Sequence, residues 1–167
     1  MLVIETERLI LRQLNAGDAS FMLSLLNDPS WIKYIGDRNI NTIEEAKDHI
    51  EKKYISSYNK NGFGLYLVEL KDKLISIGVC GLINRPSLED VDIGFAFMPE
   101  YTGSGYAYEA AKATMAYGYE KLNLERIVAI TIAENERSIN LLKKLGLRNS
   151  GNAGIPDDAD CILFVPC

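Results

Sequence analysis

A glycine-containing loop in the second half of the chain has the residue types of an anion-binding site. The loop reads Tyr101-Thr102-Gly103-Ser104-Gly105 and leads directly into a predicted helix. Glycine lets backbone amides approach a ligand closely because it carries no Cβ. The first amides of a helix have no intrahelical partners, and the helix dipole adds partial positive charge at that end. The loop therefore predicts a site for a phosphate or pyrophosphate group.

The residue order of the loop excludes one class of phosphate-binding loop and leaves other interpretations open. A Walker A loop is excluded because the string G-x-x-x-x-G-K-[ST] does not occur. A dinucleotide-binding loop needs a third small residue, and Tyr108 stands there, so binding of NAD or FAD at Gly103–Gly105 is a weaker alternative. The two glycines could also serve a tight turn and nothing else, because a short Gly-x-Gly string is common.

Other residue types with catalytic chemistry are scarce. The chain has one histidine, His49, so a site built on several histidines is excluded, and its charged neighbours predict a surface position. The three cysteines, Cys80, Cys161 and Cys167, lack C-x-x-C spacing, which argues against a zinc ribbon or a disulfide framework. Cys80 is predicted to be a buried strand residue. We expect no metal site and a reducing, cytoplasmic environment.

Composition limits the classes of protein to which the chain can belong. It has 167 residues, 47% of them hydrophobic and 25% charged, which predicts one globular domain over residues 1–167. The net charge of −5 argues against direct nucleic-acid binding and would suit a cationic partner. There is no signal-peptide pattern and no apolar run near the roughly 20 residues that cross a bilayer, so no membrane partner is expected. A homodimer is left open.

The elements that must position the loop follow from hydrophobic periodicity and from turn residues. Strands are predicted at 2–4, 8–14, 64–70, 74–83, 90–98, 126–132, around 147 and at 161–165. Helices are predicted after Asp18 up to Asp28-Pro29, at 42–60 behind a capping box of Thr42 and Glu45, from about 106, and at 135–145. Gly78 and Gly81 indicate bulges or a close backbone approach. The order predicts an α+β fold with a mixed, mostly antiparallel sheet of about six or seven strands flanked by helices.

Several short segments resemble the GNAT family of N-acetyltransferases, and most closely its ribosomal-protein alanine acetyltransferases. These segments are Glu5–Arg12, Asp92–Phe95, Gly103–Ala110, Asn135–Ile139 and Lys144–Leu147. Each segment alone is weak, but their order and spacing along the chain are specific. The resemblance implies a sheet whose central strands splay apart, with acetyl-CoA held in the gap and its pyrophosphate on the loop amides. It implies transfer of an acetyl group to a primary amine, either a protein N-terminus or a small-molecule amine.

The resemblance also assigns residues to the coenzyme and to the acceptor. The predicted coenzyme residues are Phe97, Met98, Thr102, Gly103, Ser104, Gly105, Tyr106, Ala107, Asn135 and Ser138. Trp31 and Tyr34 lie in the 28–42 segment, which varies with substrate in the family, and are predicted to contact the acceptor. Backbone amides near Phe97 could stabilise negative charge on the thioester oxygen.

Two residues are predicted to move protons. Asp92 would accept the proton of the amine, directly or through water, with Glu89 and Asp90 as the next candidates. The resemblance places Ser138 at a position that in some relatives protonates the departing thiolate. Ser138 or water would take this part, because no tyrosine follows Tyr119, where many relatives have one. The simpler interpretations are a solvated strand residue for Asp92 and helix capping for Ser138. The missing tyrosine also favours an alternative function, an acyl-CoA-binding module with little or no catalysis.

Overall fold

A computed structural model describes residues 1–156 and 158–167 of the chain, and these form an eight-stranded sheet with helices on both faces. The strand order is β1-β2-β3-β4-β5-β6-β8-β7. The strands are β1 (Leu2–Glu5), β2 (Leu9–Arg12), β3 (Leu65–Leu70), β4 (Ile75–Ile83), β5 (Val91–Phe97), β6 (Ile127–Ile132), β7 (Leu147–Asn152) and β8 (Cys161–Pro166). The predicted α+β fold is confirmed. Its eight strands exceed the six or seven expected, because both terminal hairpins pair onto the edges of the sheet.

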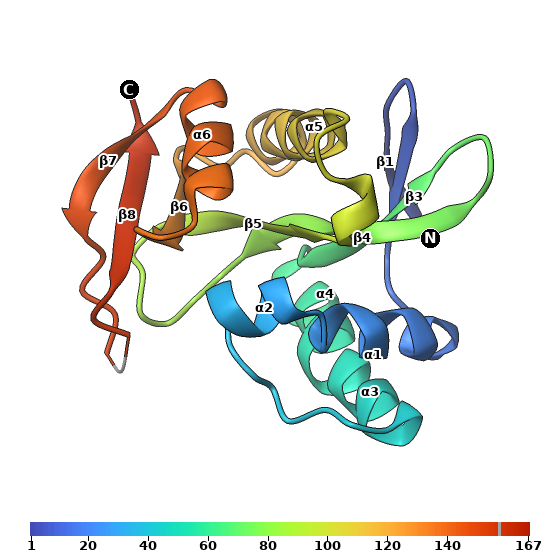
Figure 1. Cartoon of the computed structure of the whole chain (residues 1–167). Coiled ribbons are helices and arrows are strands. Elements are labelled where there is room, and N and C mark those ends of the chain that lie inside the picture. The colour runs from blue at the N-terminus through green and yellow to red at the C-terminus, as the bar shows by residue number, and fades with distance from the viewer. Residues whose placement is uncertain (157) are drawn as a thin grey trace.

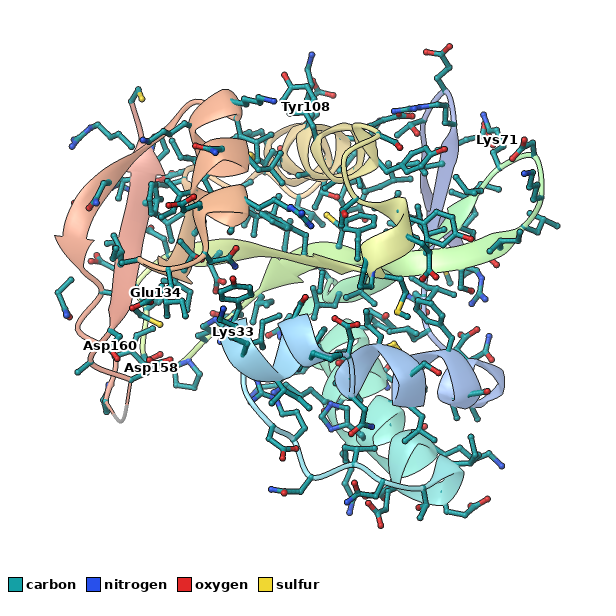
Figure 2. The ribbon with its side chains drawn as sticks, viewed as in Figure 1. Lys33, Lys71, Tyr108, Glu134, Asp158 and Asp160 are labelled. Carbon is teal, nitrogen blue, oxygen red and sulfur yellow. The ribbon has the colours of Figure 1, made fainter. Side chains whose placement is uncertain are left out.

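The helices form two layers, one on each face of the sheet (Figure 1). The first layer holds α1 (Ala19–Leu26), α2 (Pro29–Tyr34), α3 (Ile43–His49) and α4 (Ser56–Asn61). The second layer holds α5 (Tyr106–Glu120) and α6 (Glu136–Lys144). Apolar side chains fill the space between the sheet and both layers, and the core includes Leu9, Leu67, Ile77 and Ile127 (Figure 2). No helix in the described ranges combines the length and the apolar character needed to cross a bilayer.

The helical region at 42–60 differs from its prediction in two details. The segment is helical, but a π-helical stretch, Ile50–Ile55, separates α3 from α4. Thr42 caps α3, because its hydroxyl oxygen accepts from the amide of Glu45 at 3.1 Å. The capping box is wrong, however, since the carboxylate of Glu45 accepts from the amide of Asn41 at 2.9 Å and not from that of Thr42. The carboxylate therefore secures the preceding loop.

Small residues allow close packing around the central strands, as the sequence predicts. A Cβ on Gly81 would lie 2.1 Å from the carbonyl oxygen of Gly64, and one on Gly78 would lie 2.5 Å from that of Ala96. The pairing of β3 with β4 is irregular next to Gly78, so both predicted reasons for these glycines are present. The small face of α5 is buried against the sheet, and its buried residues are Ala110, Ala111, Thr114 and Gly118.

The two central strands separate after a short parallel contact. β5 and β6 pair at Val91 with Ile127 and at Asp92 with Val128, and no further pair joins them. Beyond Val128, β6 pairs with β8, while β5 remains paired with β4 from Asp92 to Phe97. The expected splay of the central strands is confirmed, and it leaves one edge of β5 without a strand partner.

Candidate active site

Two adjoining cavities follow the open edge of β5. The first, of about 590 Å³, is lined by the segment from Pro99 to Tyr108, by α2 and by the start of α6, and we call it the loop cavity. The second, of about 540 Å³, is lined by β4, β5, β6 and the first helical layer, and we call it the strand cavity. The residues that line both are Trp31, Tyr34, Ile35, Phe95, Ala96, Asn135 and Ser138. The two cavities therefore meet where β5 and β6 have separated.

The lining contributed by β5 changes along the strand. Asp92, Ile93 and Gly94 line the strand cavity, Phe95 and Ala96 line both, and Phe97 lines the loop cavity. A single strand thus connects the buried carboxylate of Asp92 with the glycine loop. A ligand that reached from the loop cavity to the junction would meet a second ligand seated in the strand cavity.

The free edge of β5 presents backbone amides to this junction. The amide of Met98 donates to the carbonyl of Ile77 in β4 at 2.9 Å. Because backbone donors alternate in direction along a strand, the amides of Phe95 and Phe97 point away from β4, into the splay. These two N–H groups can donate to a carbonyl oxygen that gains negative charge at the junction.

The glycine loop has the conformation of an anion cradle. Gly103 and Gly105 have φ values of +85° and +84°, in the left-handed region that other residues enter only at a cost. Among the described residues, no hydrogen bond uses the amides of residues 103 to 105. The first turn of α5 adds further amides that have no helical partner. A phosphate group can therefore accept several backbone hydrogen bonds here.

Ion pairing ties this loop to the N-terminal hairpin. The guanidinium of Arg8 donates to the carboxylate of Glu109 at 2.7 Å and to the carbonyl of Ser104 at 3.1 Å, and it covers the ring of Tyr106 at 4.4 Å. The Thr6 hydroxyl also donates to Glu109 at 2.7 Å. Partial burial opposes ionisation of Glu109, but the bonds from Thr6 and Arg8 outweigh it and lower the pKa of that carboxyl. The start of α5 is therefore held in place before any ligand binds.

The predicted coenzyme residues divide into two groups. Those that line the loop cavity are Phe97, Thr102, Gly103, Gly105, Ala107, Asn135 and Ser138. Met98, Ser104 and Tyr106 do not line it. Tyr106 lies under the guanidinium of Arg8, and the Ser104 carbonyl is bonded to the same side chain, so both residues support the loop from behind. Met98 is packed against the core.

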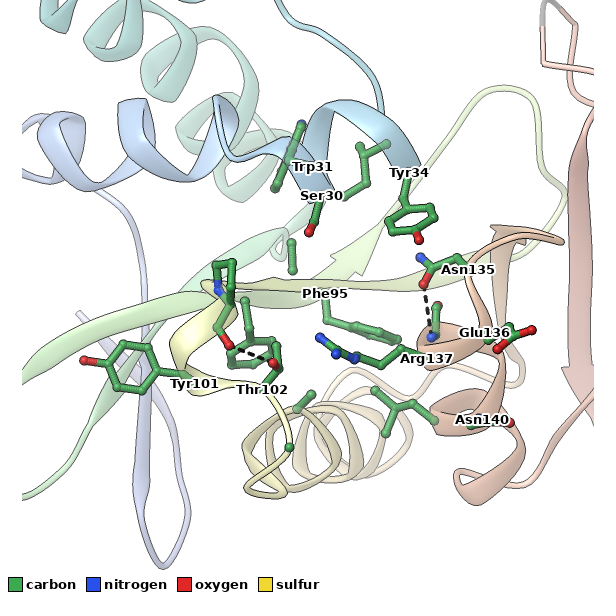
Figure 3. Close-up of a pocket in the computed structure, with 18 of the residues that line it drawn as sticks. Ser30, Trp31, Tyr34, Phe95, Tyr101, Thr102, Asn135, Glu136, Arg137 and Asn140 are labelled. Atoms are coloured by element: carbon green, nitrogen blue, oxygen red, sulfur yellow. Dashed lines mark hydrogen bonds between the residues drawn. The ribbon is translucent and has the colours of Figure 1, made fainter.

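The start of α6 closes the loop cavity on its other side. The Asn135 Oδ1 atom accepts from the amide of Ser138 at 3.3 Å, so Asn135 is the cap of this helix and the Ser138 side chain is not (Figure 3). The side chain of Arg137 extends into the cavity toward Thr102 (Figure 3). A guanidinium in this position can contact a phosphate group bound in the loop cavity.

Asp92 is a buried carboxylate on the strand cavity and not a solvated strand residue. It is 1% exposed. Its Oδ1 atom accepts from the Arg85 Nε at 2.9 Å, and its Oδ2 atom has no partner among the described residues. Burial raises the pKa of Asp92 to about 6, although the charge and hydrogen bond of Arg85 oppose the shift. The group is therefore ionised at neutral pH and basic enough to accept a proton.

The alternative bases are less well placed. Neither Glu89 nor Asp90 lines either cavity, and Asp90 is paired with Arg126 at 3.2 Å. The predicted surface position of His49 is wrong, because its ring is half-buried. The ring packs edge-on against that of Tyr54, with the two ring centroids 5.3 Å apart. Cys80 is buried as predicted, and its Sγ lies 3.5 Å from the Thr114 hydroxyl.

Sequence interpretation missed the helix that carries the predicted acceptor residues. Trp31 and Tyr34 belong to α2, which begins with an Asp28-Pro29-Ser30 start signal: Asp28 Oδ2 accepts from the Ser30 amide at 3.0 Å. Both side chains stand where the two cavities meet. The hydroxyl of Tyr34 points toward Asn135 (Figure 3). No tyrosine follows Tyr119 in the sequence, so the tyrosine hydroxyl beside Asn135 comes from α2.

Comparison with known proteins gives consistent sequence matches. Residues 8–148 match the family described as the acetyltransferase (GNAT) domain. The uncharacterized N-acetyltransferase YoaA of Bacillus subtilis is 30% identical over 151 residues, which cover 89% of this chain and 84% of that protein. The spermidine N(1)-acetyltransferase of Escherichia coli K12 is 29% identical and covers 84% of this chain and 73% of that protein. The [ribosomal protein uS5]-alanine N-acetyltransferase of the same strain is 31% identical over 103 residues, 59% of this chain and 53% of that protein.

Solved structures share the fold. The acetyltransferase from Agrobacterium tumefaciens C58 superposes with a TM-score of 0.84 at 22% identity, covering 100% of this chain and 94% of that one. A ribosomal L7/L12 α-N-protein acetyltransferase in complex with coenzyme A superposes with a TM-score of 0.81 at 15% identity, covering 99% and 96%.

Proposed function

Because this chain belongs to the GNAT family of acetyltransferases and uses acetyl-CoA as its co-substrate, we propose that it moves the acetyl group directly onto a primary amine seated in the strand cavity. The observation that carries this proposal is the meeting of the two cavities on the free edge of β5. One cavity ends in unused backbone amides, and the other holds a buried carboxylate of raised pKa.

The residues that line the loop cavity are suited to holding the coenzyme. Amides of residues 103 to 105 and of the first turn of α5 would hold the pyrophosphate, and Arg137 would add a positive charge. The thioester would lie beside Phe95 and Phe97, whose amides face the splay. When bound, the coenzyme supplies the acetyl group as an activated thioester.

The strand cavity would supply the proton chemistry on the acceptor. A protonated amine has no lone pair, so it must lose a proton before it attacks the thioester carbon. The free Oδ2 atom of Asp92 would accept that proton, directly or through water. The amides of Phe95 and Phe97 would stabilise the negative charge that develops on the carbonyl oxygen. The carbon–nitrogen bond then forms as the carbon–sulfur bond breaks. The nitrogen loses its second proton in this step, which balances the proton that the departing thiolate takes up.

The departing thiolate needs a proton, and two hydroxyl groups stand near it. Ser138 and Tyr34 both line the junction of the cavities. The Ser138 hydroxyl has no hydrogen bond among the described residues, so it is available as a donor. The hydroxyl of Tyr34 points into the same space (Figure 3). We propose Ser138 as the donor and Tyr34 as the alternative, which a comparison of Ser138→Ala with Tyr34→Phe would separate.

The test is a thiol-release assay with acetyl-CoA and a panel of amines. The panel would contain N-terminal peptides, spermidine, an amino sugar, an aminoglycoside and free amino acids. The proposal expects coenzyme release that depends on at least one amine. Tight binding of acetyl-CoA by calorimetry without release for any amine would contradict it and favour an acyl-CoA-binding module.

We also propose that the protein is located in the cytoplasm. Cys80, Cys161 and Cys167 are all free thiols, and Cys80 and Cys161 are buried. Unpaired cysteines suit a reducing compartment. Fractionation of producing cells, followed by immunoblotting, would test the location.

A further inference from the structure

The strand cavity gathers basic side chains from three separate parts of the chain. Arg38 comes from the loop between α2 and α3, Lys53 from the π-helical stretch and Arg85 from the loop after β4. The acidic residues in the described lining are Asp92 and Asp158. A chain whose net charge is −5 thus places three cations around the cavity assigned to its acceptor.

Two of these cations have no acidic partner. Arg85 is paired with Asp92, and the two charges offset each other. Within residues 1–156 and 158–167, neither Arg38 nor Lys53 has a carboxylate oxygen within 4.0 Å. Asp158 is exposed beside the β7–β8 pair (Figure 2). The side of the cavity formed by Arg38 and Lys53 is therefore electropositive.

The basic groups lie close enough to affect one another. Loss of surrounding water, followed by the positive charges of Arg38 and Arg85, lowers the pKa of Lys53. The pKa of His49 is lowered first by burial and then by Lys53 and Arg38. Like charges held together disfavour their own ionised forms. An anion bound between Arg38 and Lys53 would remove that repulsion, whereas a polyamine would add to it.

We propose that the acceptor is a small molecule that carries an oxyanion, a carboxylate or a phosphate, in addition to its amine, and that Arg38 and Lys53 bind the oxyanion. This inference rests on the proposed acetyl transfer and names the acceptor class of the same site. The guanidinium of Arg38 offers paired donors that match a carboxylate or phosphate, and Lys53 adds a mobile ammonium. The amine end would then point along β5 toward Asp92 and the junction. A cavity of about 540 Å³ suits a small molecule.

Matched acceptor pairs test the inference. Phenylalanine would be compared with 2-phenylethylamine, and glucosamine 6-phosphate with glucosamine, so that each pair differs in the oxyanion. We expect the anionic member of at least one pair to have a kcat/KM at least tenfold higher. The pair that shows the preference tells whether a carboxylate or a phosphate is recognised. Spermidine serves as the cationic comparison and is expected to be the poorest acceptor.

Variants assign the preference to the two residues. Arg38→Gln and Lys53→Gln should each reduce the preference for the anionic member about tenfold, mainly through a higher KM for that member. Lys52→Gln is the matched control, because Lys52 is exposed, pairs with Asp48 at 3.0 Å and does not line the cavity. Thermal melting of each variant would establish that it is folded.

Calorimetry separates failure of this inference from failure of the proposed function. Each acceptor would be titrated into the protein loaded with coenzyme A. Tighter binding of the anionic members, weakened by the two variants, supports the inference even if no thiol is released, and in that case the acetyl transfer fails alone. Equal binding of anionic and neutral members, or faster acetylation of spermidine, would overturn the inference while the acetyl transfer stands.

Discussion

The loop cavity and the strand cavity offer different kinds of binding groups to a ligand. The loop cavity depends on backbone amides from one continuous stretch, Thr102 to Tyr108, with α6 at its side. The strand cavity depends on side chains from segments as far apart as Arg38, Asp92 and Cys161. A site made of backbone is local in sequence, whereas a site made of side chains exists only after the sheet has formed.

The support of the two cavities differs in the same way. An ion pair between Arg8 and Glu109, neither of which lines the loop cavity, holds the glycine loop in shape, and Asn135 caps α6 at the edge of the cavity. In the strand cavity, the charged groups Arg85 and Asp92 are both support and lining. Substitutions on the coenzyme side should therefore change affinity, and substitutions on the acceptor side should change turnover as well.

Asp92→Asn is expected to have the largest effect and to distinguish the two cavities most clearly. Removal of the base should lower kcat by a factor of about 10² to 10⁴ because general base catalysis contributes that much. The dissociation constant for acetyl-CoA, measured by calorimetry, should not change. Asp90→Asn is the control, since Asp90 precedes the strand and pairs with Arg126. An Asp92→Asn enzyme with full turnover would make the carboxylate purely structural.

The wild type and Asp92→Asn should also differ in how the free energy of unfolding depends on pH. The pKa of Asp92 in the folded chain is about 6, above the ordinary value of 3.8, so folding takes up a proton between these pH values. The free energy of unfolding of the wild type should therefore fall relative to Asp92→Asn as pH rises from 4 to 7. The fall over the whole titration, from well below pH 3.8 to well above pH 6, should be about 3 kcal/mol, at 1.36 kcal/mol for each pH unit of pKa difference, and most of it should occur between pH 4 and pH 7.

Urea unfolding at a series of pH values would measure this difference. The profile of kcat/KM should rise over the same range, as Asp92 loses its proton with a pKa of about 6. A parallel pH dependence of stability in the two proteins would show that Asp92 is not the titrating group.

A smaller effect is expected on the coenzyme side from Gly105→Ala. Gly105 has a φ of +84°, and a left-handed conformation costs alanine roughly 1–2 kcal/mol. Acetyl-CoA should bind about tenfold more weakly, which corresponds to about 1.4 kcal/mol. Gly151→Ala is the matched control, because Gly151 has a φ of +95° and lines neither cavity. Equal loss of affinity in both variants would mean that the strain acts through general destabilisation.

The smallest effect should come from Glu109→Gln. The amide would keep a bond from Thr6 but lose the ionic attraction to Arg8, a partly exposed pair worth roughly 1 kcal/mol or less. Acetyl-CoA should bind a few-fold more weakly, and more so at low salt, when measured by calorimetry. Glu120→Gln, at the exposed end of the same helix, should have no effect. If Glu109→Gln and Glu120→Gln bind acetyl-CoA with equal affinity, the Arg8–Glu109 ion pair does not position the loop.

Local features of the fold were predictable from residue patterns. Alternating apolar residues indicated the strands, and Thr42 indicated the start of a helix. The π-helical stretch was not, because Ile50, Tyr54 and Tyr58 occur at ordinary helical spacing. Helix α2 was missed although its Asp28-Pro29 start is a recognisable signal, since its six residues are too few for periodicity to show.

The sequence by itself indicated the glycine loop, because glycine at positions 103 and 105 permits the left-handed φ values that the loop has. It also indicated Asp92 as a chemical group, but not that burial would raise its pKa or that Arg85 would bind it. Only the tertiary structure brought Arg38 and Lys53 to the strand cavity and Tyr34 to the junction. The physical reason is that side chains on separate elements meet through packing, so a net charge of −5 indicates nothing about the charge of one cavity.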